Sequence, residues 1–376
     1  MTSLDENKMK IPFGEMDFLA YVLPGGIMLL SIFVFEFWMF SRLGVEAVHV
    51  PVFIAFRETA QFSVFATNWI YSALYILCVL CVAYVSGQLL AVLSAFFFER
   101  VLIGKGLGYP FEHLLNVVRP GREHKEHSIA FYCGFFFWFN LYLLLRYVQT
   151  FWPSNWYRWA LFVSEAVISL AIASKLLRDF AVYKLPKKLN GTSLEKWQPR
   201  IDWFRTVVDT FLKHYFALPF RGLVNLLSSY VRLRDPLEAR ILEQYTDAFA
   251  GIFDMSPGEA GSNNYWMSRF FTGHANSRID IEINRWRWTY KFARNISMAF
   301  YISFLYCLMS SQLQSKMIPE DKGYALAVMT GAFLFMWLLA LVQYIYLYDN
   351  RYSQMVIRAF VFLSKSRKEG VSKKKR

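Results

Sequence analysis

Residues 276–295 contain the side chains of this chain that are best suited to bind phosphate. Arg278 and Arg285 are seven residues apart, so a helix places them on one face, and Lys291 is expected nearby on that side. Arginine presents a planar fork of donors that fits phosphate, and tryptophan rings offer surfaces on which bases stack. The stretch therefore predicts a site for an anionic, nucleotide-type ligand, made of Arg278, Arg285, Arg287, Lys291, Trp286 and Trp288.

A second interpretation of this stretch needs no ligand. In a helix beside a membrane, the arginines contact lipid phosphates and the tryptophans form an interfacial belt. The two interpretations are compatible, because they can use different faces of the same helix. In either case residues 276–294 are expected to form a helix that leads directly into a hydrophobic segment.

Polar residues within the apolar segments are the next candidates. Glu165 lies near the middle of the segment 156–177, where an ionised carboxylate is costly unless it is paired or hydrated. It can lock two helices together or line an ion path. Glu36 and Arg146 lie near the outer ends of their segments, where such side chains can snorkel to the interface. The candidate pore or pathway residues are Glu165, Asn140 and Glu36.

The loop 113–127 gathers His113, His124 and His127 with two glutamates, a combination that could hold a metal ion. The loop is also very polar and follows Pro120-Gly121, as a solvated connector would. No metal or cofactor site is predicted from it. The chain has no phosphate-binding glycine loop, nucleophile elbow or zinc-protease motif, so it is not expected to be an enzyme.

Composition places these candidates in a membrane protein. Hydrophobic residues make up 56% of the 376 residues and aromatic residues 19%, more than soluble proteins usually carry. A bilayer core about 30 Å thick needs about 20 apolar helical residues. Six segments qualify as transmembrane helices, the second of them long enough to project beyond the membrane: 17–40, 69–98, 131–151, 156–177, 296–314 and 324–348.

Charge predicts the orientation of these segments. Of the 41 Lys and Arg residues, 35 fall on one side of the six-span topology, which makes that side cytoplasmic. Both termini are then cytoplasmic and the protein lies in the inner (plasma) membrane. The predicted organisation is a cytosolic N-terminus (1–16), spans 1–4 with a cytosolic loop at 99–130 (17–177), a helical cytosolic domain (178–294), spans 5–6 (295–348) and an amphipathic, basic cytosolic tail (349–376).

The insert 178–294 reads as helical, because it lacks alternating strand patterns. Apolar runs follow Pro199, Pro219 and Asp235-Pro236, while residues 256–263 are expected to form a loop. The tail after 349 begins as an amphipathic helix, whose apolar face is predicted to consist of Tyr352, Met355, Val356, Ala359, Phe360 and Leu363. An all-α membrane protein with a helical insert between spans 4 and 5 follows.

Two blocks of the sequence resemble a known group of proteins. DFLAYVLPGG (17–26) contains Pro24 and two glycines, which predict a kink, and RWRWTYKFARN (285–295) leads into the fifth span. Together with the multi-pass layout they resemble bacterial membrane effectors of anti-phage defence of the Hailong type. The resemblance implies a homo-oligomeric ion channel controlled by the product of a partner nucleotidyltransferase, an oligonucleotide or cyclic nucleotide.

Three functions are therefore expected from the sequence. The first is a ligand-gated channel in the lipid bilayer. The second is a scaffold that recruits a cytosolic partner through the amphipathic tail and the acidic stretch 241–268. The third is an intramembrane lipid enzyme that uses the histidine loop.

Overall fold

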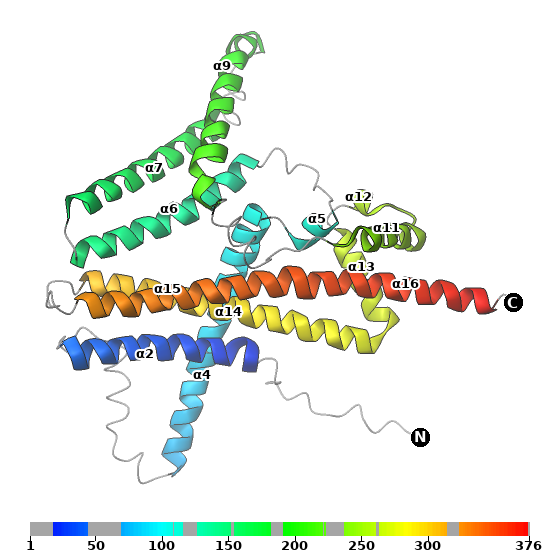
Figure 1. Ribbon diagram of the computed structural model, residues 1–376, viewed down its shortest axis with the longest axis horizontal. Coiled ribbons are helices and arrows are strands. Elements are labelled where there is room, and N and C mark those ends of the chain that lie inside the picture. Colours follow the sequence, from blue (N-terminus) through cyan, green and yellow to red (C-terminus); the bar gives the residue numbers. More distant parts are fainter. Residues whose placement is uncertain are drawn as a thin grey trace. The chain divides into compact units, whose positions relative to one another are not determined.

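The structure, a computed structural model, describes residues 18–43, 69–107, 109–115, 126–151, 154–181, 191–220, 222, 237–260, 263–313 and 323–374 (Figure 1). All regular structure in these ranges is helical, as predicted. Five helical stretches are long and apolar enough to cross a membrane: Ala20–Met39, Ala73–Gly104, Asn155–Asp179, Arg278–Ser311 and Ala325–Ser366. They correspond to predicted spans 1, 2, 4, 5 and 6. The predicted third span forms helix α6 (Glu126–Phe151), which is not among the five.

The chain divides into two compact units. Unit 1 contains Met1–Phe96 and Asn284–Leu347, and unit 2 contains Phe97–Ile283 and Tyr348–Arg376. The π-helical turn η1 (Phe18–Val22) and helices α2 (Leu23–Leu43), α4 (Trp69–Ser94) and α15 (Gly323–Tyr346) belong to unit 1, as does most of α14 (Ser277–Leu313). Helix α14 continues without interruption from the basic stretch into the apolar segment, as the sequence predicted.

Unit 1 contains a very close crossing of α2 and α4 (Figure 1). A Cβ atom placed on Gly25 of α2 would lie 1.9 Å from the backbone oxygen of Ala83, and one on Gly87 of α4 would lie 1.8 Å from that of Tyr21. Helix α4 therefore passes over Gly25 of α2, and the preceding turn η1 passes over Gly87 of α4, so no side chain fits at either position. Small residues at helix crossings are typical of packing in membranes, where close backbone approach supplies the contact energy.

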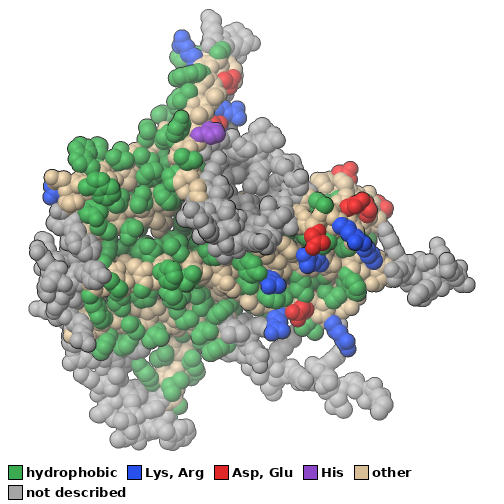
Figure 2. Space-filling view, viewed as in Figure 1, with side chains coloured by type: hydrophobic (Ala, Val, Ile, Leu, Met, Phe, Trp, Pro, Cys, Tyr) green, Lys and Arg blue, Asp and Glu red, His purple; other side chains and the backbone are tan. Residues whose placement is uncertain are grey.

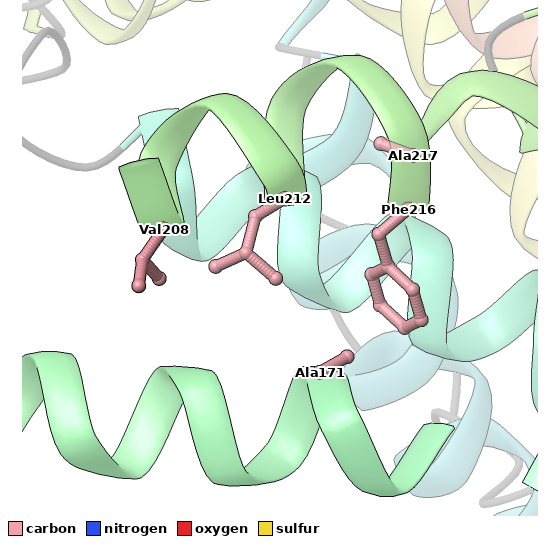
Figure 3. Packing of buried hydrophobic residues seen from close by; sticks show 5 residues of the cluster. All are labelled: Ala171, Val208, Leu212, Phe216 and Ala217. Carbon is pink, nitrogen blue, oxygen red and sulfur yellow. The ribbon is translucent and has the colours of Figure 1, made fainter. Parts of the chain in front are cut away.

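Part of unit 2 is a bundle of α6, α7 (Asn155–Asp179), α9 (Gly191–Thr210) and the π-helical segment η7 (Phe211–Phe216). Its core contains Ala171 of α7 facing Val208, Leu212 and Phe216 (Figure 3). Gly134 of α6 lets the Phe216 ring come so near that a Cβ would lie 2.4 Å from it. Arg178, which is 2% exposed, and Asp209 form an ion pair of 2.7 Å that ties the end of α7 to α9.

Elsewhere in unit 2, α11 (Ala239–Phe253), α12 (Pro257–Ala260), α13 (Asn264–Ala275) and α16 (Gln354–Lys374) pack through aromatic side chains. Phe360 of α16 contacts Tyr245, Phe249 and Phe253 of α11 as well as Phe271 of α13. The tail is helical, as predicted. Its apolar face is covered by the chain itself.

Two local predictions for the insert were wrong. Helix α9 begins at Gly191, so Pro199 lies inside it rather than ahead of it. Residues 197–200, around this proline, are exposed. Residues 257–260 form α12 rather than loop, because Ser256 and Glu259 bond each other's backbone N–H at 3.2 and 2.8 Å, which is a capping box. Most of the run after Pro219 lies outside the described residues.

Candidate functional site

The candidate ligand residues lie in the first half of α14. The carboxamide oxygen of Asn276 accepts the backbone N–H groups of Arg278 and Ile279 at 3.0 and 3.2 Å, which caps the helix at its predicted start. Arg269 of α13 pairs with Asp280 at 2.5 Å. Arg278, in unit 2, is exposed.

The remaining candidates are in unit 1. Arg285 is exposed, whereas Arg287, Lys291, Trp286 and Trp288 are half-buried. The Lys291 ammonium lies 4.8 Å from the centroid of the Trp288 ring. Arg285 precedes Trp288 by three residues and Lys291 follows it by three, so the ring lies between two cations on the helix surface.

The sequence predicted Lys291 on the same side of the helix as Arg285. Helix geometry places the two residues on different faces. Six residues at about 100° each place it about a third of a turn away from Arg285. It lies instead near Arg287, four residues before it. The cations of α14 therefore form two rows with Trp288 between them rather than one stripe.

A buried polar cluster lies one turn beyond Lys291, and we call it the polar junction: Ala20, Ala91, Ser94, Arg294 and Asn295. The Asn295 amide donates to the carbonyl oxygen of Ala20 at 2.7 Å, and the Ser94 hydroxyl donates to the Asn295 carboxamide oxygen at 2.7 Å. The Arg294 guanidinium donates to the same oxygen at 3.2 and 3.3 Å and to the carbonyl oxygen of Ala91 at 3.4 Å. Asn295 is 1% exposed and Arg294 6%.

Pro24 explains why Asn295 is bonded to this carbonyl. Ala20 lies in the π-helical turn η1, and Pro24, four residues later, has no N–H to supply the donor that an α-helix would give this carbonyl. A donor from another helix stabilises a buried carbonyl that lacks its α-helical donor. The Asn295 amide does so. The two sequence blocks singled out above, 17–26 and 285–295, thus meet at the polar junction.

Glu36 forms a second polar contact of α14 within unit 1. It is 1% exposed, and the Tyr306 hydroxyl donates a short hydrogen bond to its carboxylate. The ring of Tyr306 also packs edge-on against Phe35. Glu36 is therefore packed between α2 and α14 and does not snorkel to an interface, whereas Arg146 of α6 is exposed.

Glu165 and Asn140 lie on α7 and α6 of unit 2. The Glu165 side chain is exposed on the surface of α7, and the Tyr142 side chain of α6 lies near it. The Asn140 amide donates to the Phe136 carbonyl of its own helix at 2.7 Å. Its carboxamide oxygen is buried and has no hydrogen-bond partner within the described ranges. Glu165 is thus available to solvent or to a second molecule, whereas Asn140 is partly turned inward.

The histidine loop contributes no site that can be described. His124 lies outside the described residues, as do the side chains of His113 and His127. Among the residues that the structure describes, no three His, Cys, Asp or Glu side chains gather as a metal site would require.

No known protein family, curated protein or solved structure matches the chain.

The polar junction was missed by sequence reasoning, although one signal pointed to it. Pro24 was interpreted as a kink, but its position also identifies Ala20 as the carbonyl that needs a donor. Asn295 and Ser94 gave no comparable signal, because a single polar residue near the end of an apolar helix has many possible partners.

Proposed function

We propose that this chain is a membrane effector in which an anionic, nucleotide-type ligand binds the cytoplasmic half of α14 and controls an ion path formed by several copies. The observation that carries the proposal is that α14 is one unbroken helix from Ser277 to Leu313. The ligand residues lie on this helix, as do Arg294 and Asn295 of the polar junction and Tyr306, the partner of Glu36. A shift at its basic end is therefore transmitted to contacts inside the apolar half of unit 1.

The arrangement around Trp288 supports an aromatic, phosphate-bearing ligand. The indole ring offers a stacking surface, and the exposed Arg285 guanidinium can form paired hydrogen bonds with phosphate oxygens. Lys291 is one turn from Asn295, about 6 Å along the helix axis. Binding at this position acts directly beside the polar junction.

Glu165 supports the ion path. A carboxylate on the outer surface of an apolar helix is expensive against lipid, and water or a second protein surface lowers that cost. Copies arranged around an axis with α7 toward the centre would place a ring of carboxylates along a hydrated path. Such rings favour cations over anions. A homo-oligomer in the inner membrane, with both termini cytoplasmic, is part of this proposal.

A flux assay on purified protein in vesicles tests both the ligand site on α14 and the ion path at Glu165. The probes are a linear triadenylate and cyclic di-adenosine monophosphate, with inorganic phosphate as the reference anion. We expect one nucleotide probe to change potassium flux in the wild type, Arg285→Ala to weaken its binding about tenfold or more, and Glu165→Gln to lower flux without changing binding. Arg240→Ala removes an exposed arginine from α11 and is the matched control, with no effect on either.

Two results would count against the proposal. One is a flux that no probe alters. The other is a flux that Glu165→Gln leaves at the wild-type value. The antiviral setting and the partner nucleotidyltransferase rest on the resemblance of 17–26 and 285–295, and phage plating on cells with and without the chain tests them.

A scaffold is the second candidate, with a different docking surface from the one the sequence indicated. The apolar face of the tail helix packs on α11 and α13, so it does not serve a partner. Trp266 and Phe270 of α13 are 62% and 68% exposed and lie one turn apart. Capture of one defined protein by the wild type, lost in Trp266→Ala, would favour this function.

A further inference from the structure

Helix α9 and segment η7 carry large apolar side chains on both their inner and outer faces, and the outer face also bears the exposed Asp202, Thr206 and Thr210. The inner face, with Phe204, Val208, Leu212 and Phe216, packs against α6 and α7. The outer face leaves Trp203, Val207, Tyr215 and Leu218 exposed by 68, 46, 68 and 60%. A helix at the surface of a soluble domain is polar on its outer face. Hydrophobic side chains along α9, continuous with those over α6 and α7, are visible in Figure 2.

The inner face shows at what depth the segment lies. It contacts Phe131, Phe135 and Trp138 of α6, together with Val167 and Ala171 of α7. The indole of Trp138 donates to the carbonyl oxygen of Phe216 at 3.1 Å. Ala171 is eight residues before the end of α7, about 12 Å along the helix axis. If α7 crosses the membrane, η7 therefore packs beside its cytoplasmic half rather than above it.

Charged side chains lie at the end of α7 and along α9, next to the apolar surface of these helices. The Arg178–Asp209 ion pair lies at the cytoplasmic end of α7, and Arg205 approaches Asp209 to 3.8 Å. Arg200 lies 5.0 Å from the centroid of the Trp197 ring. Tryptophan and tyrosine next to arginine are typical of helices that lie in the plane of the membrane interface.

We propose that α9 and η7 form an interfacial helix whose outer face, with Trp203, Val207 and Tyr215, is immersed in the cytoplasmic leaflet of the bilayer. The partner of this surface is lipid. The segment was expected to belong to a cytosolic domain, and this placement moves residues 197–218 to the membrane surface. The inference rests on the proposed membrane crossing of α7 and is independent of conduction and of ligand binding.

Spin labels on the full-length protein in vesicles test the immersion. In a background with the four native cysteines replaced by alanine, single cysteines are introduced as Trp203→Cys, Val207→Cys and Tyr215→Cys. Collision with oxygen, which concentrates in lipid, is compared with collision with a water-soluble nickel chelate. We expect oxygen-to-nickel ratios several-fold above that of Glu243→Cys, an exposed position on α11 that serves as the aqueous control.

A label at Phe162→Cys, on the exposed surface of α7, distinguishes a failure of the interfacial-helix proposal from a failure of the α7 membrane crossing. If it reports lipid while the three α9–η7 labels match Glu243→Cys, the interfacial helix is wrong and the membrane crossing of α7 stands. If Phe162→Cys is itself aqueous, the crossing of α7 fails. Labels on α9–η7 that are immobilised and closed to both reagents would show a protein partner there, which also overturns the proposal.

Discussion

Asn295 connects three elements of unit 1 through a single carboxamide. Its amide satisfies the Ala20 carbonyl of η1, and its oxygen accepts from Ser94 at the end of α4 and from the neighbouring Arg294. These groups are buried. Loss of the carboxamide removes the side-chain donor of the Ala20 carbonyl and one acceptor of Ser94 and Arg294, which keep the Ala91 carbonyl as a second acceptor.

We therefore expect Asn295→Ala to lower the free energy of unfolding by about 1–3 kcal/mol. Detergent-induced unfolding in mixed micelles measures this. Thr289→Ala is the control, because Thr289 bonds only the Arg285 carbonyl of its own helix turn. It should change stability by less than about 0.5 kcal/mol. Equal losses in the two variants would show that Asn295 has no special role.

Tyr245 makes the stability of unit 2 sensitive to alkaline pH. Its hydroxyl lies 2.8 Å from the Ser268 hydroxyl in a buried cluster, and burial raises its pKa above the ordinary value of 10.0. In the unfolded chain this tyrosine ionises near pH 10.0, whereas in the folded chain it keeps its proton to higher pH. Its contribution to stability is therefore fully present below pH 10 and is lost as pH rises above it.

The measurement is the midpoint of thermal unfolding between pH 8.5 and 11, for the wild type and for Tyr245→Phe. We expect the wild type to lose stability more steeply above pH 10, because the phenylalanine variant has no proton to lose at this position. Parallel curves for the two proteins would contradict the buried, neutral tyrosine.

At the scale of helices, the crossing of α2 and α4 is the most specific packing in unit 1. Gly25 and Gly87 make this close crossing possible, whereas Gly26 takes no part in it. Gly26 has open space around its Cβ position, although it adjoins Gly25 in the same helix turn. The three glycines therefore allow a matched comparison.

Gly25→Ala and Gly87→Ala should each destabilise the protein by about 3 kcal/mol, the upper end for overpacking, because the new methyl group meets backbone rather than a side chain that can move. Gly26→Ala should be neutral or slightly stabilising, since alanine is the better helix former. Unfolding in detergent compares the three. Similar effects at positions 25 and 26 would mean that the close crossing does not exist.

Much of the helical pattern could be predicted from the sequence, because hydrophobic length and periodicity depend on local residues. The long second apolar helix, the unbroken passage from 276 into the fifth apolar segment and a helix in the tail were all predicted. The partners of these helices could not be predicted in the same way. Gly25 was interpreted as part of a kink, and only its distance from Ala83 shows that it is a contact.

In the candidate site, too, the local features could be predicted from the sequence and the long-range contacts could not. Arg285 and Trp288 were identified from residue type and spacing, and spacing alone could also have separated Lys291 from Arg285. The burial of Glu36 and the bond between Asn295 and Ala20 depend on which helix lies opposite. These long-range contacts carry no local signature beyond the missing N–H of Pro24.

For the whole molecule, the distribution of Lys and Arg predicts which side of the membrane each part faces. We expect a single cysteine at Glu243→Cys to react with an impermeant maleimide only after the cells are lysed, and one at Asn155→Cys to react in intact spheroplasts. Both positions are exposed, and the four native cysteines are removed as before. Labelling of Glu243→Cys from outside would place the proposed ligand residues away from any cytosolic nucleotide.

Coupling along α14 is the central claim, and one comparison tests it directly. Wild type and Asn295→Ala are reconstituted in vesicles, and nucleotide binding and ion flux are measured on the same preparation. The account predicts that both proteins bind the nucleotide with similar affinity and that only the wild type changes its flux in response. A full flux response in Asn295→Ala at wild-type affinity would contradict it.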